Sequence, residues 1–328
     1  MGEHVRTRGD RVRLRIMSRF VQVNGLRMHI LEEGSGPLVL LLHGFPEFSG
    51  TWRHQIRALA EGGYRVVAPD QRGYGLTDCP EREDAYTMLH LVGDVIGLLD
   101  ALEAPQAVVV GHDWGAPVAW NAALMRPDRV RAVVGLSMPA SARAPLRPTE
   151  RMRHVFGDGF YQLYFQQPGV AERDFEADVR GGLRRLMHAA SGDVPAENRW
   201  PLVVRGAFFD GLADPGVAPA WLGEEQLDAL TAVFTRSGFR GGLSWYRNLD
   251  RNWEQAAAFA GLTIRQPALF VMGDADPTYV AARRAIDVLP QMVPGLRRSL
   301  IIPGGGHWIG EEQPETINAA LLEFLAGL

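Results

Sequence analysis

The sequence predicts an α/β protein with a mostly parallel, eight-stranded sheet, flanking helices and one inserted helical segment. Short apolar runs alternate with segments of helical periodicity over most of the chain, which is typical of such a sheet. Polar residues follow directly after these runs, where parallel strands gather catalytic groups. The alternation stops between about residues 140 and 265, where Pro and Gly interrupt short helical pieces.

The first two strands are predicted to form a hairpin at one edge of the sheet. FVQV and LRMHILEEG flank Asn24-Gly25, a dipeptide typical of a two-residue type I′ turn. The later strands are apolar on both faces, as expected of buried parallel strands. They are PLVLLLHG, YRVVAPD, AVVVG, VRAVVGLS, PALFVMGD and RRSLIIPG.

The helices between these strands have recognisable ends. Thr87 is placed to cap a helix that stops before Pro105, and Pro117 lies in the first turn of the next helix. Pro314 opens a last helix. Within the interruption the clearest helix is 224–236, with three apolar residues on one face.

We interpret the interruption as a helical cap over the catalytic edge of the sheet. The predicted organisation is a solvated leader, a first core segment, the cap and a second core segment. Their ranges are 1–18, 19–140, 141–262 and 263–328.

Composition narrows the possible partners and compartments. A net charge of −4 over 328 residues does not indicate nucleic acid or an anionic membrane as a partner. No apolar run is long enough to span a bilayer, and the Arg-rich N-terminus lacks the apolar core of a signal peptide. A single cysteine, Cys79, excludes an internal disulfide, so we expect a cytoplasmic location.

The stretch AVVVGHDWGAPVAW, residues 107–120, is the strongest chemical signal. A strand, a sharp turn and a helix, with Gly111 and Gly115 beside the turn, form the frame of a nucleophile elbow. The residue that this frame projects is Asp113, where serine is the usual occupant. The alternatives are a helix-capping Asp in an ordinary turn and a phosphate loop, but G-x-G-x-x-G is absent.

A carboxylate at the elbow changes the chemistry. With a reference pKa of about 3.9, aspartate is already an anion at neutral pH and can attack a saturated carbon directly. A histidine is then free to activate the water that cleaves the resulting ester. The pattern therefore indicates epoxide opening or halide displacement, and it excludes a serine esterase at this elbow.

Several motifs together are similar to those of the α/β-hydrolase-fold epoxide hydrolases, of the soluble type without an extra N-terminal domain. The resemblance covers nearly everything after the leader. The motifs are HGFPEF, DQRGYG, VVVGHDWGAPVAW, FYQLYFQQPGVAE, SGFRGGLSWYRN, GDADPTY and GGGHW.

The resemblance implies a role for each matching residue. His307 is the expected base, and Asp276 is the acid that orients it, with Asp274 as a rival two residues earlier. The expected oxyanion-hole donors are the backbone N–H groups of Phe45 and Trp114.

The leaving group is expected to take its proton from the cap. An epoxide oxygen leaves as an alkoxide, and Tyr161 and Tyr246 match the family's proton donors, with Tyr164 as a rival to the first. Other aromatic residues are expected to line an apolar tunnel that binds the substrate. They are Phe48, Trp52, Trp114 and Phe160.

Two other functions are kept as alternatives. A haloalkane dehalogenase would share the Asp nucleophile, but such relatives often carry Asn at the position of Phe45. A non-catalytic ligand-binding relative would lack the base or the acid. We expect a lipophilic epoxide and water as partners and no metal or organic cofactor, and a homodimer is left open.

Overall fold

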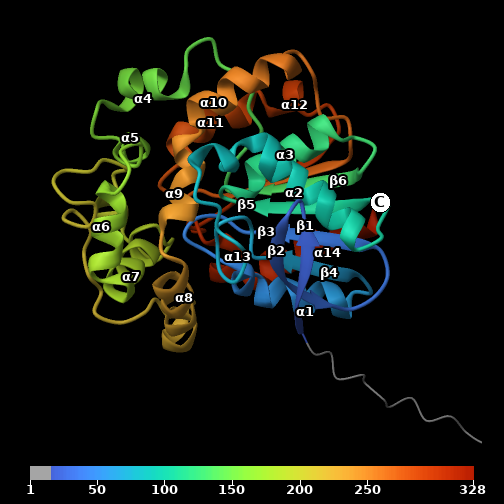
Figure 1. The fold of residues 1–328 in the computed structure, drawn as a ribbon, viewed down its shortest axis with the longest axis horizontal. Coiled ribbons are helices and arrows are strands. Elements are labelled where there is room, and N and C mark those ends of the chain that lie inside the picture. Colours follow the sequence, from blue (N-terminus) through green and yellow to red (C-terminus); the bar gives the residue numbers. More distant parts are fainter. Residues whose placement is uncertain (1–15) are drawn as a thin grey trace, which may run out of the picture.

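The computed structural model describes residues 16–328, which contain one eight-stranded sheet in the order β1-β2-β4-β3-β5-β6-β7-β8 (Figure 1). β2 is antiparallel to both of its neighbours, and the pairs from β4 to β8 are parallel. The predicted mostly parallel sheet is therefore confirmed. Its strands are β1 Met17–Val23, β2 Leu26–Glu33, β3 Leu38–Leu42, β4 Arg65–Pro69, β5 Ala107–His112, β6 Val130–Leu136, β7 Ala268–Gly273 and β8 Leu296–Ile302.

The predicted hairpin is present. Asn24 has φ 48° and Gly25 has φ 78°, and a type I′ turn requires positive φ at both central residues. β1 begins at Met17, so the last two residues of the predicted leader belong to the first strand. Residues 1–15 of that leader lie outside the described part of the chain.

Helices cover both faces of the sheet. α1 and α14 pack together on one face, and α2 and α3 pack together on the other. Every residue of β3 and β5 is buried, which explains why these strands read as continuous apolar runs. The flanking helices are α1 Arg53–Glu61, α2 Met88–Ala101, α3 Gly115–Met125, α11 Tyr279–Asp287, α12 Leu289–Met292, α13 Ile309–Glu312 and α14 Pro314–Ala326.

The segment between β6 and β7 consists of helices joined by irregular stretches, and its β-type pairing is an isolated bridge between Phe160 and Val203. Figure 1 shows α4 to α8 standing beside the sheet. The helix predicted over 224–236 is α8, and its apolar face is buried. The cap helices are α4 Pro148–Phe156, α5 Tyr161–Tyr164, α6 Val170–Ala177, α7 Val179–Ala189, α8 Gly223–Ser237, α9 Arg240–Arg247 and α10 Leu249–Gln255. Short 3₁₀ helices lie at Ser49–Trp52, Glu83–Tyr86, Ala196–Asn198 and Ala256–Phe259.

One aromatic side chain joins the cap to the sheet. The Phe45 ring, just after β3, makes edge-on contacts with four phenylalanines of the cap and with Tyr246. The phenylalanines are Phe165, Phe175, Phe234 and Phe239. Cap and sheet residues therefore share one hydrophobic core.

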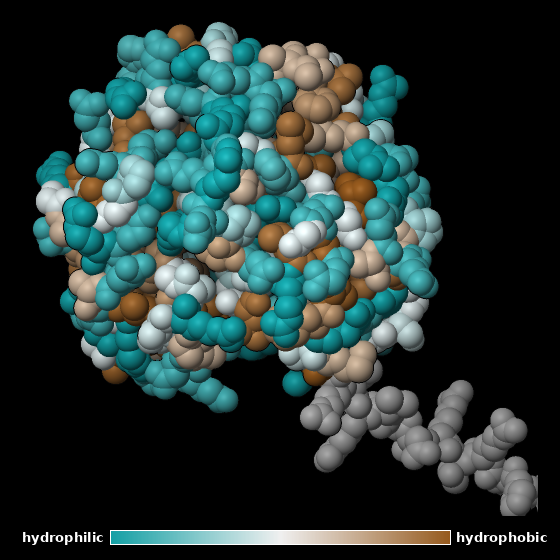
Figure 2. Space-filling model, in the orientation of Figure 1, coloured by the Kyte–Doolittle hydropathy of each residue, from teal (hydrophilic) through white to brown (hydrophobic). Residues whose placement is uncertain are grey.

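The outer surface is ordinary for a globular protein. Figure 2 shows apolar residues scattered among hydrophilic ones on the viewed face. Within residues 16–328, no helix has both the length and the apolar character needed to cross a membrane.

Candidate active site

The turn between β5 and α3 has the geometry of a nucleophile elbow. Asp113 has φ 46°, in the left-handed region that a residue with a side chain rarely adopts. Such a conformation costs about 1–3 kcal/mol and persists where the surrounding structure imposes it. The turn places the Asp113 carboxylate beyond the carboxyl end of the central strand.

Two glycines make this turn possible. A methyl group at Gly111 would collide with the carbonyl oxygen of Gly115, and one at Gly115 would collide with that of Leu42. A methyl group at Gly44 would collide with the Asp113 side chain itself. The small residues of the elbow are therefore required by backbone contacts around the carboxylate.

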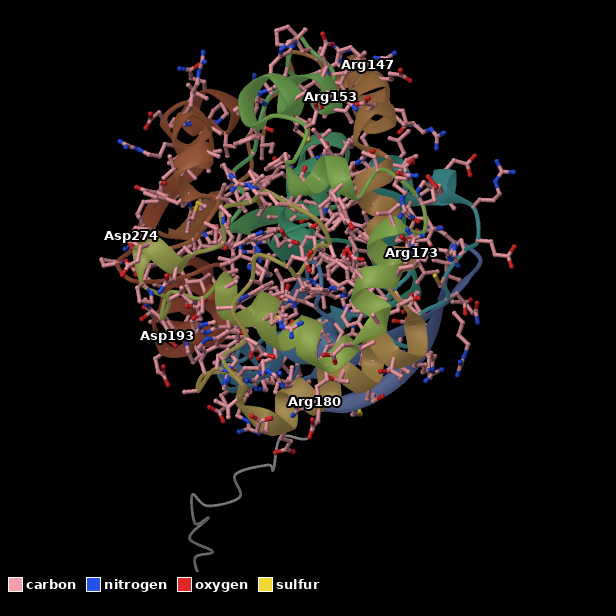
Figure 3. All side chains as sticks on the ribbon, turned by 90° about the vertical axis from the view of Figure 1, so that its left-hand side faces the viewer. Arg147, Arg153, Arg173, Arg180, Asp193 and Asp274 are labelled. Atoms are coloured by element: carbon pink, nitrogen blue, oxygen red, sulfur yellow. The ribbon has the colours of Figure 1, made fainter. Side chains whose placement is uncertain are left out.

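The structure brings the predicted acid, base and nucleophile together. His307 Nδ1 lies 2.8 Å from Asp276 Oδ2, and His307 Nε2 lies 3.5 Å from Asp113 Oδ2. Asp276 is buried, and its other oxygen accepts two hydrogen bonds from Thr278. The rival Asp274 is exposed and lies at the periphery in Figure 3, where it accepts from the N–H of Gly304.

The charged forms of His307, Asp113 and Asp276 stabilise one another. Burial alone would lower the pKa of His307, but the Asp276 and Asp113 carboxylates outweigh it and raise that pKa well above its usual value. Burial alone would raise the pKa of Asp113, but His307 and His112 lower it below its usual value. The site is therefore suited to an ionised carboxylate beside an imidazolium in the free protein.

A second buried pair holds the His307 backbone, and the sequence analysis missed it. His112 Nε2 donates to the His307 carbonyl at 2.7 Å, and Glu47 Oε2 lies 2.8 Å from His112 Nδ1. Ser137 Oγ donates to the same carbonyl at 3.0 Å. His112 precedes the nucleophile and Glu47 follows HGFP, so position in the motifs was the available signal.

The Phe45 N–H already faces the nucleophile. It donates to Asp113 Oδ1 at 2.8 Å, which is the geometry expected of an oxyanion-hole donor. Trp114 lies at the N-terminus of α3, where N–H groups have no partner within the helix.

The two predicted tyrosines lie together above this carboxylate. Tyr161 and Tyr246 are both buried, with ring centroids 6.2 Å apart. Burial, with the nearby Asp113 charge, raises the pKa of both phenols, so they stay protonated near neutral pH. Tyr164 instead donates its hydroxyl to Asp174 at 2.6 Å, so it is engaged elsewhere in the cap.

The acid, base, nucleophile and both tyrosines open onto one cavity, whose empty space together with its solvent-open mouth is about 420 Å³. The rest of its wall is almost entirely apolar and comes from both cap and core. These lining residues are Phe45, Phe165, Leu186, Ala190, Trp200, Leu202, Phe208, Pro277, Thr278 and Trp308.

The predicted substrate-binding aromatics do not form this wall. Trp52 packs on the face of the sheet that α1 and α14 cover, and it lines a separate, smaller cavity with Glu47 and His112. Phe160 stacks on Phe156 at 4.3 Å, and Phe48 packs beside Gly50. Trp114 packs edge-on against Tyr246. Sequence reasoning missed Trp200 and Phe208, because only the folding of the cap brings them to the cavity.

Within residues 16–328, no group of three or more His, Cys, Asp or Glu side chains is arranged to hold a metal ion.

Comparisons with known proteins agree with this fold. A family model described as alpha/beta hydrolase fold matches residues 37–314. Epoxide hydrolase A of Mycobacterium tuberculosis is 48% identical, over 94% of this chain and 97% of that protein. Epoxide hydrolase 3 of Siraitia grosvenorii is 41% identical, over 93% of this chain and 96% of that protein.

The chain belongs to the epoxide hydrolase family of the α/β-hydrolase fold. A solved structure described as an epoxide hydrolase from an endophytic Streptomyces superimposes with a TM-score of 0.93 at 44% identity. That match covers 95% of this chain and 96% of the other. Family membership confirms the predicted fold class and the predicted class of enzyme.

Proposed function

We propose that this chain converts an epoxide and water into a vicinal diol through a covalent ester on Asp113. One observation carries the proposal: the nucleophile, the His307–Asp276 pair and two protonated phenols open onto a single apolar cavity. Membership of the epoxide hydrolase family supports the same reaction class.

The first step uses the carboxylate and the phenols. Asp113 attacks one epoxide carbon, forming a C–O ester bond while the ring C–O bond breaks. The released oxygen carries negative charge and takes a proton from Tyr161 or Tyr246. General acid assistance of this kind contributes about 10²–10⁴-fold.

The second step uses the histidine. His307 takes a proton from a water molecule, and the water oxygen attacks the carbonyl carbon of the Asp113 ester. The negative oxygen that forms accepts hydrogen bonds from the N–H groups of Phe45 and Trp114. Each such donor stabilises the transition state by about 3 kcal/mol. When this oxygen re-forms the carbonyl, the bond between the acyl carbon and the substrate oxygen breaks, and the leaving diol oxygen takes the proton held by His307. The Asp113 carboxyl group then gives up its proton, which restores the phenol that protonated the epoxide oxygen.

A change in charge links the two steps. Two carboxylates, those of Asp276 and Asp113, raise the pKa of His307 in the free enzyme. Esterification removes the Asp113 charge, so the pKa of His307 falls and the imidazole is released to act as a base. Formation of the Asp113 ester therefore converts His307 into the base that is needed to hydrolyse this ester.

The family relatives favour epoxide hydrolysis over the two alternatives. The side chain of Phe45 offers no hydrogen-bond donor to a halide, whereas the paired phenols suit an alkoxide. A lipophilic epoxide suits the apolar wall of the cavity. The cytoplasmic location and the domain limits stay predictions from the sequence, which leaves a homodimer open.

The test is a single turnover in H₂¹⁸O with enzyme in excess over styrene oxide. The ester route predicts ¹⁸O in the Asp113 carboxylate and unlabelled diol, because water attacks the ester carbonyl. Mass spectrometry of the Asp113 peptide and of the diol shows which of them carries the ¹⁸O. Label appearing first in the diol would mean direct attack by water and would refute the proposal.

A further inference from the structure

The backbone on both sides of His307 is held by a carboxylate outside the triad. Glu312 is the last residue of α13. Its Oε2 accepts the N–H of Gly306 at 3.0 Å, and its Oε1 accepts the N–H of Trp308 at 3.0 Å. One side chain therefore fixes the residues directly before and after His307.

The same carboxylate reaches the cap. Glu312 Oε2 also accepts the N–H of Gly192 at 2.8 Å, three residues beyond the end of α7. Figure 3 labels the next residue, Asp193, on the same side of the molecule as Asp274. Glu312 thus lies at the junction between the His307 loop and the cap.

Further contacts join the loop and the cap at this junction. The His307 N–H donates to the Ala190 carbonyl at 2.9 Å, and the Trp308 indole donates to the Met187 carbonyl at 2.9 Å. A methyl group at Gly192 would collide with the Gly304 carbonyl oxygen. The two segments therefore meet backbone to backbone, with no room for a side chain between them.

Residues at this junction also form part of the wall of the substrate cavity. Leu186 and Ala190, from the end of α7 and just after it, line the cavity that His307 enters. The position of His307 relative to a bound ester therefore depends on the same hydrogen bonds that hold this wall. Reacting groups must be placed accurately, because a misplacement of about 1 Å can cost about 100-fold in rate.

We propose that Glu312 is a positioning residue for hydrolysis of the Asp113 ester, holding His307 and the cavity wall in one arrangement. The inference deepens the proposed function and rests on it. A carboxylate suits this role because its two oxygens accept three N–H groups. Gln has only one acceptor oxygen, and its NH₂ group would face N–H donors.

The experiment compares Glu312→Gln with wild type and with Glu315→Gln, which removes the same charge from an exposed site nearby. Rapid quenching with styrene oxide measures ester formation and ester hydrolysis separately. We expect Glu312→Gln to slow ester hydrolysis by about 100-fold. Ester formation should change far less, so alkylated enzyme accumulates, while Glu315→Gln matches wild type.

Hydrogen exchange provides a readout that needs no turnover. The amides of Gly192, Gly306 and Trp308 should exchange faster in Glu312→Gln than in Glu315→Gln. If Glu312→Gln does not fold, Glu312→Asp is used for the same measurements. This variant keeps both carboxylate oxygens but moves them away from the three N–H groups by the length of one methylene. It should slow the same step to a smaller extent.

Two results would overturn the assignment. One is a folded Glu312 variant whose ester hydrolyses at the wild-type rate. The other is an equal slowing of both steps together with unchanged exchange at the three amides, which would show that Glu312 neither holds these amides nor acts on ester hydrolysis in particular. Wild-type enzyme that forms no ester would instead refute the proposed function, while the exchange data would still report on the junction.

Discussion

Replacement of His307 by Gln should trap the covalent intermediate. Gln cannot accept a proton from water, whereas Asp113 and the Phe45 N–H that contacts it are left in place. General base catalysis contributes up to about 10⁴-fold, which is about 5.5 kcal/mol of activation free energy. Ester hydrolysis should therefore slow by about this factor and become far slower than ester formation.

The assay is intact-protein mass spectrometry after mixing the variant with styrene oxide. The expected spectrum shows a mass increase equal to one substrate molecule, which peptide mapping places on Asp113. The matched control, Asp113→Asn in the same His307→Gln background, should show no increase. A folded His307→Gln protein that binds epoxides but never gains mass would refute the two-step reasoning.

Four further changes test separate parts of the site. Tyr161→Phe combined with Tyr246→Phe should reduce ester formation by about 10²-fold or more, measured by rapid quench; unchanged formation would reject both as proton donors. Asp276→Asn should reduce turnover of styrene oxide strongly and Asp274→Asn should not, because only Asp276 contacts His307; equal losses would contradict this. Gly115→Ala should lower the melting temperature, because its methyl group meets the Leu42 carbonyl; an unchanged melting temperature would contradict the packing argument. Because the pKa of His307 is raised in the folded state, its contribution to stability is complete below about pH 6.5 and is lost as pH rises through the folded-state value. Wild type should therefore melt at a higher temperature than His307→Gln at pH 6, and this difference should shrink as the pH rises to 10. A difference that stays constant would contradict an ion pair between His307 and its carboxylate neighbours.

The sequence predicted the features that depend on local pattern. The Asn24-Gly25 turn, the buried strands and the elbow at Asp113 are each encoded within a few neighbouring residues. Asp274, Asp276 and His307 were expected at one edge of the sheet because they come after parallel strands, but only the family resemblance chose Asp276 over Asp274. In the structure it is Asp276 that contacts His307.

The cavity wall could not be predicted in the same way. Trp52 lies four residues after the HGFPEF motif and Trp200 lies far from every motif. In the structure Trp52 packs on the face of the sheet that α1 and α14 cover, whereas Trp200 lines the cavity. Which of them faces the substrate depends on how the cap folds between β6 and β7, where the chain has no strand periodicity to fix the register. The Glu47–His112 pair was missed because buried charged pairs leave no periodic signal.

The contacts of Phe45 tie the folding of the two layers together. Its ring is packed among cap residues while its N–H group touches Asp113, so the cap cannot lose its packing without disturbing that donor. We therefore expect heat to melt cap and sheet in one cooperative transition, and calorimetry should record a single peak.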